Sequence, residues 1–268
     1  MDELRETAVL TTLTTRWLGR TYRYFARIGS TNDALKEAAA ADPLLPAGTM
    51  FLTDYQSQGR GRLQRRWLAP LGSSLLLSLL FRPDWRPEQA QWLTMLASTA
   101  AAEAVEAVTG LWVGVKWPND LVVAIDGVWH KFSGLLLEGS LGENGRFQHI
   151  ILGIGINVNI PAAQMPESVT PAASLLLAAG RRISRLDLLA DFLQRLETRY
   201  EQAKNGQSPQ PAWQERLITI GQQVLVTHSG TGQQIRGLAE GCDDWGRLLV
   251  RDEASVLHTI AAGDVTLR

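Results

Sequence analysis

Apolar residues follow a helical period in some segments of the chain and a strand-like pattern in others. The clearest helix is predicted from Pro87 to Gly110, because apolar residues recur there every three or four positions and glycine commonly ends a helix. A second long helix is predicted after Ser184, which can cap it together with Asp187. A shorter, alanine-rich helix is predicted directly after residues 30–32.

Strand-like runs occupy much of the first 160 residues, and proline, glycine and aspartate separate them. The predicted strands cover residues 22–28, 49–53, 73–81, 111–117, 119–125, 133–139 and 148–160. Strands and helices follow one another in an irregular order, which favours an α+β fold with a mixed sheet over a doubly wound sheet.

The composition changes at residues 204–213, which are rich in glycine, proline and glutamine. From residue 222 onward, short strand-like runs alternate with glycine turns, a pattern typical of a small β-barrel. We therefore predict two domains, residues 1–219 and residues 220–268. A barrel this short has a marginal core of its own, so we expect it to dock on the larger domain.

The overall composition is that of a globular protein, with 45% hydrophobic residues and a formal charge of -1. Balanced charge argues against an extended surface for nucleic acid. No apolar run reaches the roughly 18 to 20 residues that cross a bilayer, and no signal peptide is recognisable, so we expect a cytoplasmic protein without a membrane partner. Cys242 is the only cysteine and the four histidines lack metal-ligand spacing, so no metal site is predicted.

A concentrated basic segment interrupts this balanced charge. Residues 54–67, DYQSQGRGRLQRRW, contain four arginines, and glycines at positions 59 and 61 let the backbone approach a ligand closely. Guanidinium groups bind phosphate in a bidentate manner. Because predicted strands flank the segment, we predict a loop that closes over a nucleotide triphosphate. The alternative for this segment alone is a solvated basic loop.

Further polar segments are candidates for the same site as this loop. Each of them, taken singly, also has a purely structural explanation. Ser30 to Asn32 can cap a helix, and the KWPND segment at 116–120 can form a turn. Lys131, placed just before the strand predicted at 133–139, can be a solvated lysine. The glycines of the GIGIN run at 153–157 can mark a strand bend.

In their order along the chain, these segments resemble the biotin protein ligase family, whose members attach biotin to carboxylase carrier domains. The chain reads STN, GRGRLQRRW, KWPND, KFSGLLLE and GIGINVN where the family has STN, GRGR-x-x-R-x-W, KWPND, K-x-x-G-hydrophobic-L-x-E and GIGINV-type segments. One departure is Gln64, where many members have a glycine. The resemblance implies a class-II-synthetase-like mixed sheet with helices packed behind it and a C-terminal SH3-like barrel.

The resemblance also implies roles for individual residues. The implied biotin-binding residues are Ser30, Thr31, Asn32, Gln56, Gly59, Arg60, Lys131 and Gly134. The implied ATP-binding and adenylate-binding residues are Arg60, Arg62, Arg65, Trp67, Lys116, Asn119 and Asn157. The catalytic residues would be Lys131, Arg62 and Asp120.

The implied reaction has two steps, in which biotin and ATP form biotinyl-5'-AMP and a lysine of a biotin carboxyl carrier protein then attacks it. Biotin is already ionised near neutrality, so the first step needs charge neutralisation by Lys131, Arg62 and Mg2+ on the triphosphate rather than a base. Asp120 would orient or deprotonate the acceptor amine.

The carrier protein and a second copy of the chain are the expected partners, both at exposed strand edges. Only 29 residues precede Ser30, so no helix-turn-helix fits and no nucleic acid is expected as a partner.

Two other functions remain as alternatives. A lipoate or octanoate protein ligase is related in fold, but such enzymes lack the pairing of GRGR-x-x-R-x-W with KWPND. A non-catalytic biotin-binding module would not need Lys131 and Arg62, which are both present. Glu138, Trp112 and Trp129 receive no role, because packing or surface cover explains each.

Overall fold

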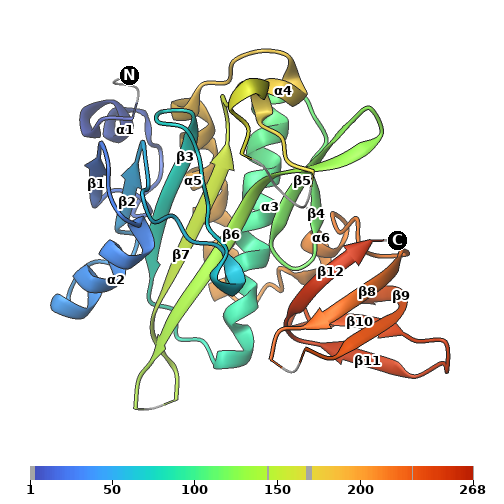
Figure 1. Cartoon of the computed structure of the whole chain (residues 1–268). Coiled ribbons are helices and arrows are strands. Elements are labelled where there is room, and N and C mark those ends of the chain that lie inside the picture. Colours follow the sequence, from blue (N-terminus) through green and yellow to red (C-terminus); the bar gives the residue numbers. More distant parts are fainter. Residues whose placement is uncertain (1–3, 144, 167–170, 231, 268) are drawn as a thin grey trace.

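In the computed structural model, which describes residues 4–143, 145–166, 171–230 and 232–267, a seven-stranded sheet forms the centre of the larger part (Figure 1). Its strand order is β1-β2-β3-β7-β6-β5-β4. The strands are β1 (Tyr22–Phe25), β2 (Met50–Thr53), β3 (Ser74–Phe81), β4 (Gly114–Lys116), β5 (Asp120–Ile125), β6 (Val128–Leu141) and β7 (Phe147–Asn157). Only β1 and β2 pair in parallel within this sheet, so the sheet is mixed and the predicted α+β class is confirmed.

Two long helices, α3 (Ala90–Thr109) and α5 (Arg185–Lys204), pack against each other behind the sheet (Figure 1). Helix α3 ends at Gly110, whose φ of 79° places it in the left-handed region that glycine favours. Helix α5 begins after Ser184, whose hydroxyl accepts from the backbone N–H of Asp187 at 3.1 Å. The shorter helices are α1 (Glu6–Thr12), α4 (Leu175–Ala179) and α6 (Gln210–Gln214), and the 3-10 turns are η1 (Arg62–Gln64), η2 (Pro87–Gln89) and η3 (Ala162–Gln164).

Helix α2 (Thr31–Ala41) covers part of the opposite face of the sheet. Its Leu35 packs in a small core with Leu80 of β3 and Ile151 of β7. Because side chains alternate along a strand, the neighbouring Leu79 and Phe81 point instead into the main core against α3 and α5. The rest of this face, over β6 and β7, lies below the loop between β2 and β3, as Figure 1 shows.

The C-terminal part is a five-stranded antiparallel sheet with the order β11-β10-β9-β8-β12. Its strands are β8 (Gln223–His228), β9 (Gln234–Cys242), β10 (Leu248–Arg251), β11 (Leu257–Ile260) and β12 (Gly263–Leu267). Tryptophans hold its β9–β10 turn against the larger part: Trp117 Nε1 donates to the Gly246 carbonyl at 2.9 Å, and the Trp92 and Trp245 rings stack at 6.1 Å. The division at residues 219 and 220 stays a prediction.

The start of β6 differs from the prediction. Asp126 and Gly127, with φ of 50° and 78°, form a tight turn that joins β5 directly to β6. Lys131 therefore lies inside β6 rather than just before a strand. The reason is a local signal, since an Asp-Gly pair between apolar runs favours a two-residue hairpin. The first strand is also shorter than predicted and ends at Phe25.

None of the helices in the described part of the chain combines the length and the apolar character that are needed to span a bilayer.

Candidate functional site

The basic loop and the uncovered face of the large sheet enclose a cleft of about 780 Å³. Residues of β6 and β7 form its floor, and the start of α2, the KWPND turn and the end of β12 form its sides. The predicted site residues that line it are Ser30, Thr31, Asn32, Gln56, Arg60, Arg62, Arg65, Trp67, Lys116, Asn119, Asp120, Lys131, Gly134 and Asn157.

Gly59 is the predicted residue that does not line the cleft. Its carbonyl accepts from the backbone N–H of Trp67 at 2.9 Å, which closes the loop on itself. A Cβ at this position would lie 2.4 Å from the Trp67 carbonyl oxygen, so only glycine fits. Gly59 thus shapes the loop from its base.

A pair of glycines creates a flat floor under the loop. Gly134 of β6 and Gly155 of β7 are direct neighbours in the strand register. The Trp67 indole lies on them, and a Cβ at Gly155 would come within 2.6 Å of that ring. The Trp67 Nε1–H is buried and has no hydrogen-bond partner among the described residues.

Lys131 stands beside this floor. Its Nζ lies 2.7 Å from Asp120 Oδ1 and 5.7 Å from the centroid of the Trp67 ring. Lys116 also lines the cleft, and burial lowers the pKa of its ammonium, with Asp120 opposing this shift and the positive charge of Lys131 acting in the same direction as burial. Two ammonium groups therefore face one cleft, and the Asp120 carboxylate acts on both of them.

The arginines of the loop reach different acceptors around the cleft. Arg62 Nη1 donates to Asn119 Oδ1 at 3.0 Å, and Arg65 pairs with Asp264 of β12. Burial lowers the pKa of Arg62, but a guanidinium stays charged in proteins. Arg66 donates to the Ser57 carbonyl at 3.1 Å, within its own loop. Arg62 and Arg65 thus donate to an amide oxygen and a carboxylate oxygen. Phosphate oxygens are acceptors for the same guanidinium groups and could take these places.

The loop turns sharply at the position of the sequence departure. Leu63 and Gln64 both have positive φ, 53° and 60°. The left-handed region costs an ordinary residue roughly 1–2 kcal/mol, whereas glycine adopts it freely. A glycine, which many members of the resembling family have at position 64, would therefore fit this turn with less strain.

Polar contacts order the end of the cleft next to α2. Thr31 donates through its backbone N–H to Gln56 Oε1 at 2.8 Å, and its hydroxyl lies 3.1 Å from the same oxygen. The Ser30 hydroxyl accepts from the Asp33 N–H at 3.4 Å, so Ser30 caps α2 as the structural explanation predicted, while it also lines the cleft. Helix capping and a place in the site therefore do not exclude each other.

Three residues that the sequence analysis left without a role join the site. Glu138 accepts from Asn32 Nδ2 at 3.0 Å, and Ser78 Oγ donates to Asn32 Oδ1 at 2.5 Å. Asp264 comes from the far end of the chain to meet Arg65. Glu138 was detectable because it follows Gly134 by four residues and so shares its face of β6, and Ser78 is a lone polar residue in an apolar run. No local pattern singles out Asp264.

Comparisons with known proteins agree with this arrangement. The profile of the Biotin/lipoate A/B protein ligase family matches residues 24–157, and that of the Biotin protein ligase C terminal domain matches residues 219–268. The bifunctional ligase/repressor BirA of Bacillus spizizenii is 33% identical over 269 residues, which cover 99% of this chain and 79% of that protein.

Two further relatives add a second curated ligase and a solved structure. The biotin–(acetyl-CoA-carboxylase) ligase of Mycobacterium tuberculosis is 36% identical over 248 residues, 90% of this chain and 86% of that protein. The structure of biotin protein ligase from Aquifex aeolicus in complex with biotin and ATP superposes with a TM-score of 0.75 at 27% identity, covering 93% of this chain and 99% of that one.

Proposed function

Because the chain belongs to the biotin protein ligase family, we infer that it activates biotin with ATP to biotinyl-5'-AMP and transfers the biotinyl group to a lysine of a biotin carboxyl carrier protein. One observation of the structure carries this inference. Lys131 and the loop arginines line the same cleft as Thr31 and Gln56, so cations surround a pocket that also has neutral polar groups at one end.

The first step joins two anions. A biotin carboxylate oxygen attacks the α-phosphorus of ATP, the bond to the bridging oxygen breaks, and pyrophosphate leaves. In this proposal Lys131 neutralises the carboxylate and the α-phosphate, and Arg62 and Arg65 exchange Asn119 and Asp264 for phosphate oxygens. Asn157, whose Oδ1 is buried without a partner among the described residues, faces the nucleotide.

The remaining proposed contacts bind the two substrates. Thr31, Gln56 and the neighbouring Ser30 and Asn32 contact the biotin rings, and Gly134 allows close approach of the strand backbone, whereas Gly59 acts indirectly by shaping the base of the loop. Trp67 stacks on adenine, and its place on the glycine floor supports a role in covering the intermediate.

The second step is aminolysis of the mixed anhydride. The acceptor lysine attacks the acyl carbon, AMP leaves with the electrons of the broken bond, and the amine loses a proton. We propose that Asp120 orients this amine or takes its proton. The carboxylate lies 2.7 Å from Lys131 Nζ, so it is close to the carboxylate end of biotin in this arrangement.

Magnesium would enter with ATP. The cleft contains the carboxylates of Asp120 and Asp264, each already beside a cation. Within the described part of the chain, no cluster of three or more histidine, cysteine, aspartate or glutamate side chains could hold a metal ion. These residues fit an ion held mainly by the triphosphate, which would supply charge neutralisation.

The expected partners beyond the carrier protein stay predictions. A second copy of the chain could pair at an exposed strand edge, and no nucleic acid is part of the proposed function. A cytoplasmic location likewise stays a prediction of the sequence.

Pyrophosphate exchange tests the proposed first step. Purified protein with biotin, ATP and magnesium should exchange labelled pyrophosphate into ATP, and lipoate or octanoate should not replace biotin. The lipoate alternative is not favoured by relatives that are named for biotin. Exchange with lipoate alone would overturn the ligand assignment, and biotin binding without any exchange would favour a binding module.

A further inference from the structure

Glu138 occupies a central position that the proposed reaction does not yet use. It lies on β6, and its side chain shares the cleft face with Gly134 because residues four apart in a strand point the same way. Its neighbour in the register is Ile151, which packs under α2. The Glu138 side chain is 21% exposed, so it sits between the sheet, α2 and the loop rather than in open solvent.

Three donors from two segments converge on this carboxylate. Asn32 Nδ2 donates at 3.0 Å and Lys36 Nζ lies at 3.4 Å, both from α2. The third donor is Arg60 of the basic loop. The Arg60 guanidinium also pairs with Asp33 Oδ1 at 2.6 Å, so one loop residue is held simultaneously by the sheet and by α2.

A buried polar chain leads from Glu138 to the proposed biotin contacts. Asn32 Oδ1 accepts from Ser78 Oγ at 2.5 Å, and Ser78 Oγ lies 2.7 Å from Thr31 Oγ1. Asn32 fits here only because Gly153 has no side chain, since a Cβ there would lie 2.2 Å from Asn32 Oδ1. The amide of Asn32 is therefore oriented from both ends, by Ser78 and by Glu138.

Charge favours a stable contact with Arg60 at neutral pH. Burial acts to raise the pKa of Glu138, but the hydrogen bonds from Asn32 and Arg60 outweigh it and hold the pKa below its usual range. The carboxylate is therefore ionised across the neutral range. Asp33 and Glu138 together balance Arg60 and Lys36, which leaves no net charge in the cluster.

We propose that Asp33 and Glu138 form a latch on Arg60 that keeps the basic loop closed over the cleft, with Glu138 acting as a positioning residue. Arg60 is 37% exposed, and pairs this accessible add little to global stability, so a role in holding the loop explains the cluster better than a role in the fold. The catalytic consequence rests on the proposed function. A closed loop excludes water, which would otherwise attack the acyl carbon of the adenylate and release biotin, AMP and a proton.

Limited proteolysis of the protein without ligand tests the latch directly. Trypsin cleaves after arginine, and the loop offers Arg60, Arg62, Arg65 and Arg66. In Glu138→Gln, cleavage within residues 60–66 should accelerate about tenfold, because a charge-assisted contact that held the loop is weakened. The melting temperature should stay close to that of the unchanged protein.

Glu103→Gln is the matched control. The Glu103 side chain is also 21% exposed and also pairs with arginine, but it lies on α3, away from the cleft. Its loop cleavage should match that of the unchanged protein. Asp33→Asn is a second variant that retains the fold, since the Asp33 side chain is 40% exposed, and it should accelerate cleavage by a smaller factor.

A catalytic readout separates positioning from packing. With biotin and ATP but no acceptor, Glu138→Gln should release several-fold more AMP per adenylate formed, and Glu138→Asp should restore part of the retention. Unchanged loop cleavage in Glu138→Gln, or equal acceleration in Glu103→Gln, would overturn the latch. Absence of exchange in the unchanged protein would instead reject the proposed function, and the proteolysis result would still decide the latch.

Discussion

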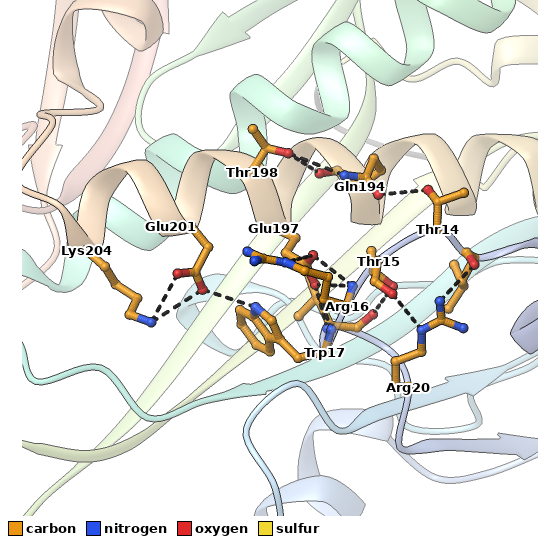
Figure 2. A network of polar contacts seen from close by, with 12 residues as sticks. Thr14, Thr15, Arg16, Trp17, Arg20, Gln194, Glu197, Thr198, Glu201 and Lys204 are labelled. Carbon is orange, nitrogen blue, oxygen red and sulfur yellow. Dashed lines mark hydrogen bonds and ion pairs between the residues drawn. The ribbon is translucent and has the colours of Figure 1, made fainter.

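Glu197, outside the cleft, and the carboxylates in the cleft face different kinds of nitrogen donor. The donors to Glu197 are backbone N–H groups, whereas those in the cleft are side-chain cations. Glu197 of α5 accepts from the backbone N–H groups of Arg16, Trp17 and Leu18 at 2.9 to 3.1 Å, and the residue is only 3% exposed (Figure 2). In the cleft, by contrast, Asp120 and Asp264 face side-chain cations and are 23% and 36% exposed.

Whether a donor belongs to the backbone or to a side chain decides whether the contact can exchange its partner. The backbone N–H groups can separate from Glu197 only if residues 16–18 move away from α5. This contact therefore stabilises the folded structure. A guanidinium on a loop can turn from a carboxylate to a phosphate while the sheet stays unchanged. The pKa of Glu197 lies below its usual range, since the three N–H groups outweigh the effect of burial, and the pKa of Glu138 shifts in the same direction. The direction of the shift therefore does not distinguish structural from exchangeable contacts.

The largest effect is expected from Lys131→Ala. Loss of the proposed stabilising cation should reduce adenylate formation by about a hundredfold or more, while the free energy of unfolding changes little because the lysine is 29% exposed. Pyrophosphate exchange and urea denaturation measure the two quantities. Biotin affinity, measured by calorimetry, should remain; if it falls as far as the rate does, Lys131 is a binding residue only.

Glu197→Ala should show the opposite profile. Three N–H groups, of which that of Leu18 is buried and the other two are partly buried, would lose a charged acceptor, which should lower the free energy of unfolding by about 3 kcal/mol. The exchange rate of the folded protein should stay near that of the unchanged chain. Glu201→Ala, one turn further along α5, is the control and should cost less, because the Glu201 side chain pairs with the Trp17 indole N–H and with Lys204 rather than with backbone N–H groups (Figure 2). A loss for Glu197→Ala no larger than the control would break the comparison.

Acid should weaken the Glu197 contact in a defined pH range. Its folded-state pKa is below the unfolded value of about 4.3, so its stabilisation is complete above that value and is lost as the pH falls through the lower folded pKa. Glu197→Gln should therefore show a shallower loss of stability below about pH 4.3 than the unchanged protein. Urea denaturation from pH 6 to pH 3 measures this; identical slopes would count against it.

The smallest effect is expected from Asp264→Asn. Arg65 is 66% exposed in this pair, and such surface pairs contribute about 0–1 kcal/mol, so the unfolding free energy should change by less than that. Release of Arg65 for phosphate should lower the KM for ATP by at most about fivefold. A marked loss of stability would mean that Asp264 belongs with Glu197 as a structural carboxylate.

Local sequence patterns predicted much of the fold. The 3.6-residue period predicted α3. The helix ends at Gly110 because glycine adopts a positive φ freely. The prediction failed where a short signal was overlooked: Asp126 and Gly127 start β6 early and carry Lys131 into the strand. The motifs also selected residues that all line the cleft except Gly59, but they did not identify the partners of those residues.

The sequence by itself determined which segments are helices and strands and which chemical groups are available, because periodicity, turn residues and motif order act over short stretches of chain. Only the tertiary structure decided which charged groups meet. Arg65 and Asp264 are 199 positions apart, and Arg60 and Glu138 are 78 apart. Such contacts depend on strand register, on the alternation of strand faces and on the docking of the small sheet, and no local pattern encodes these distances.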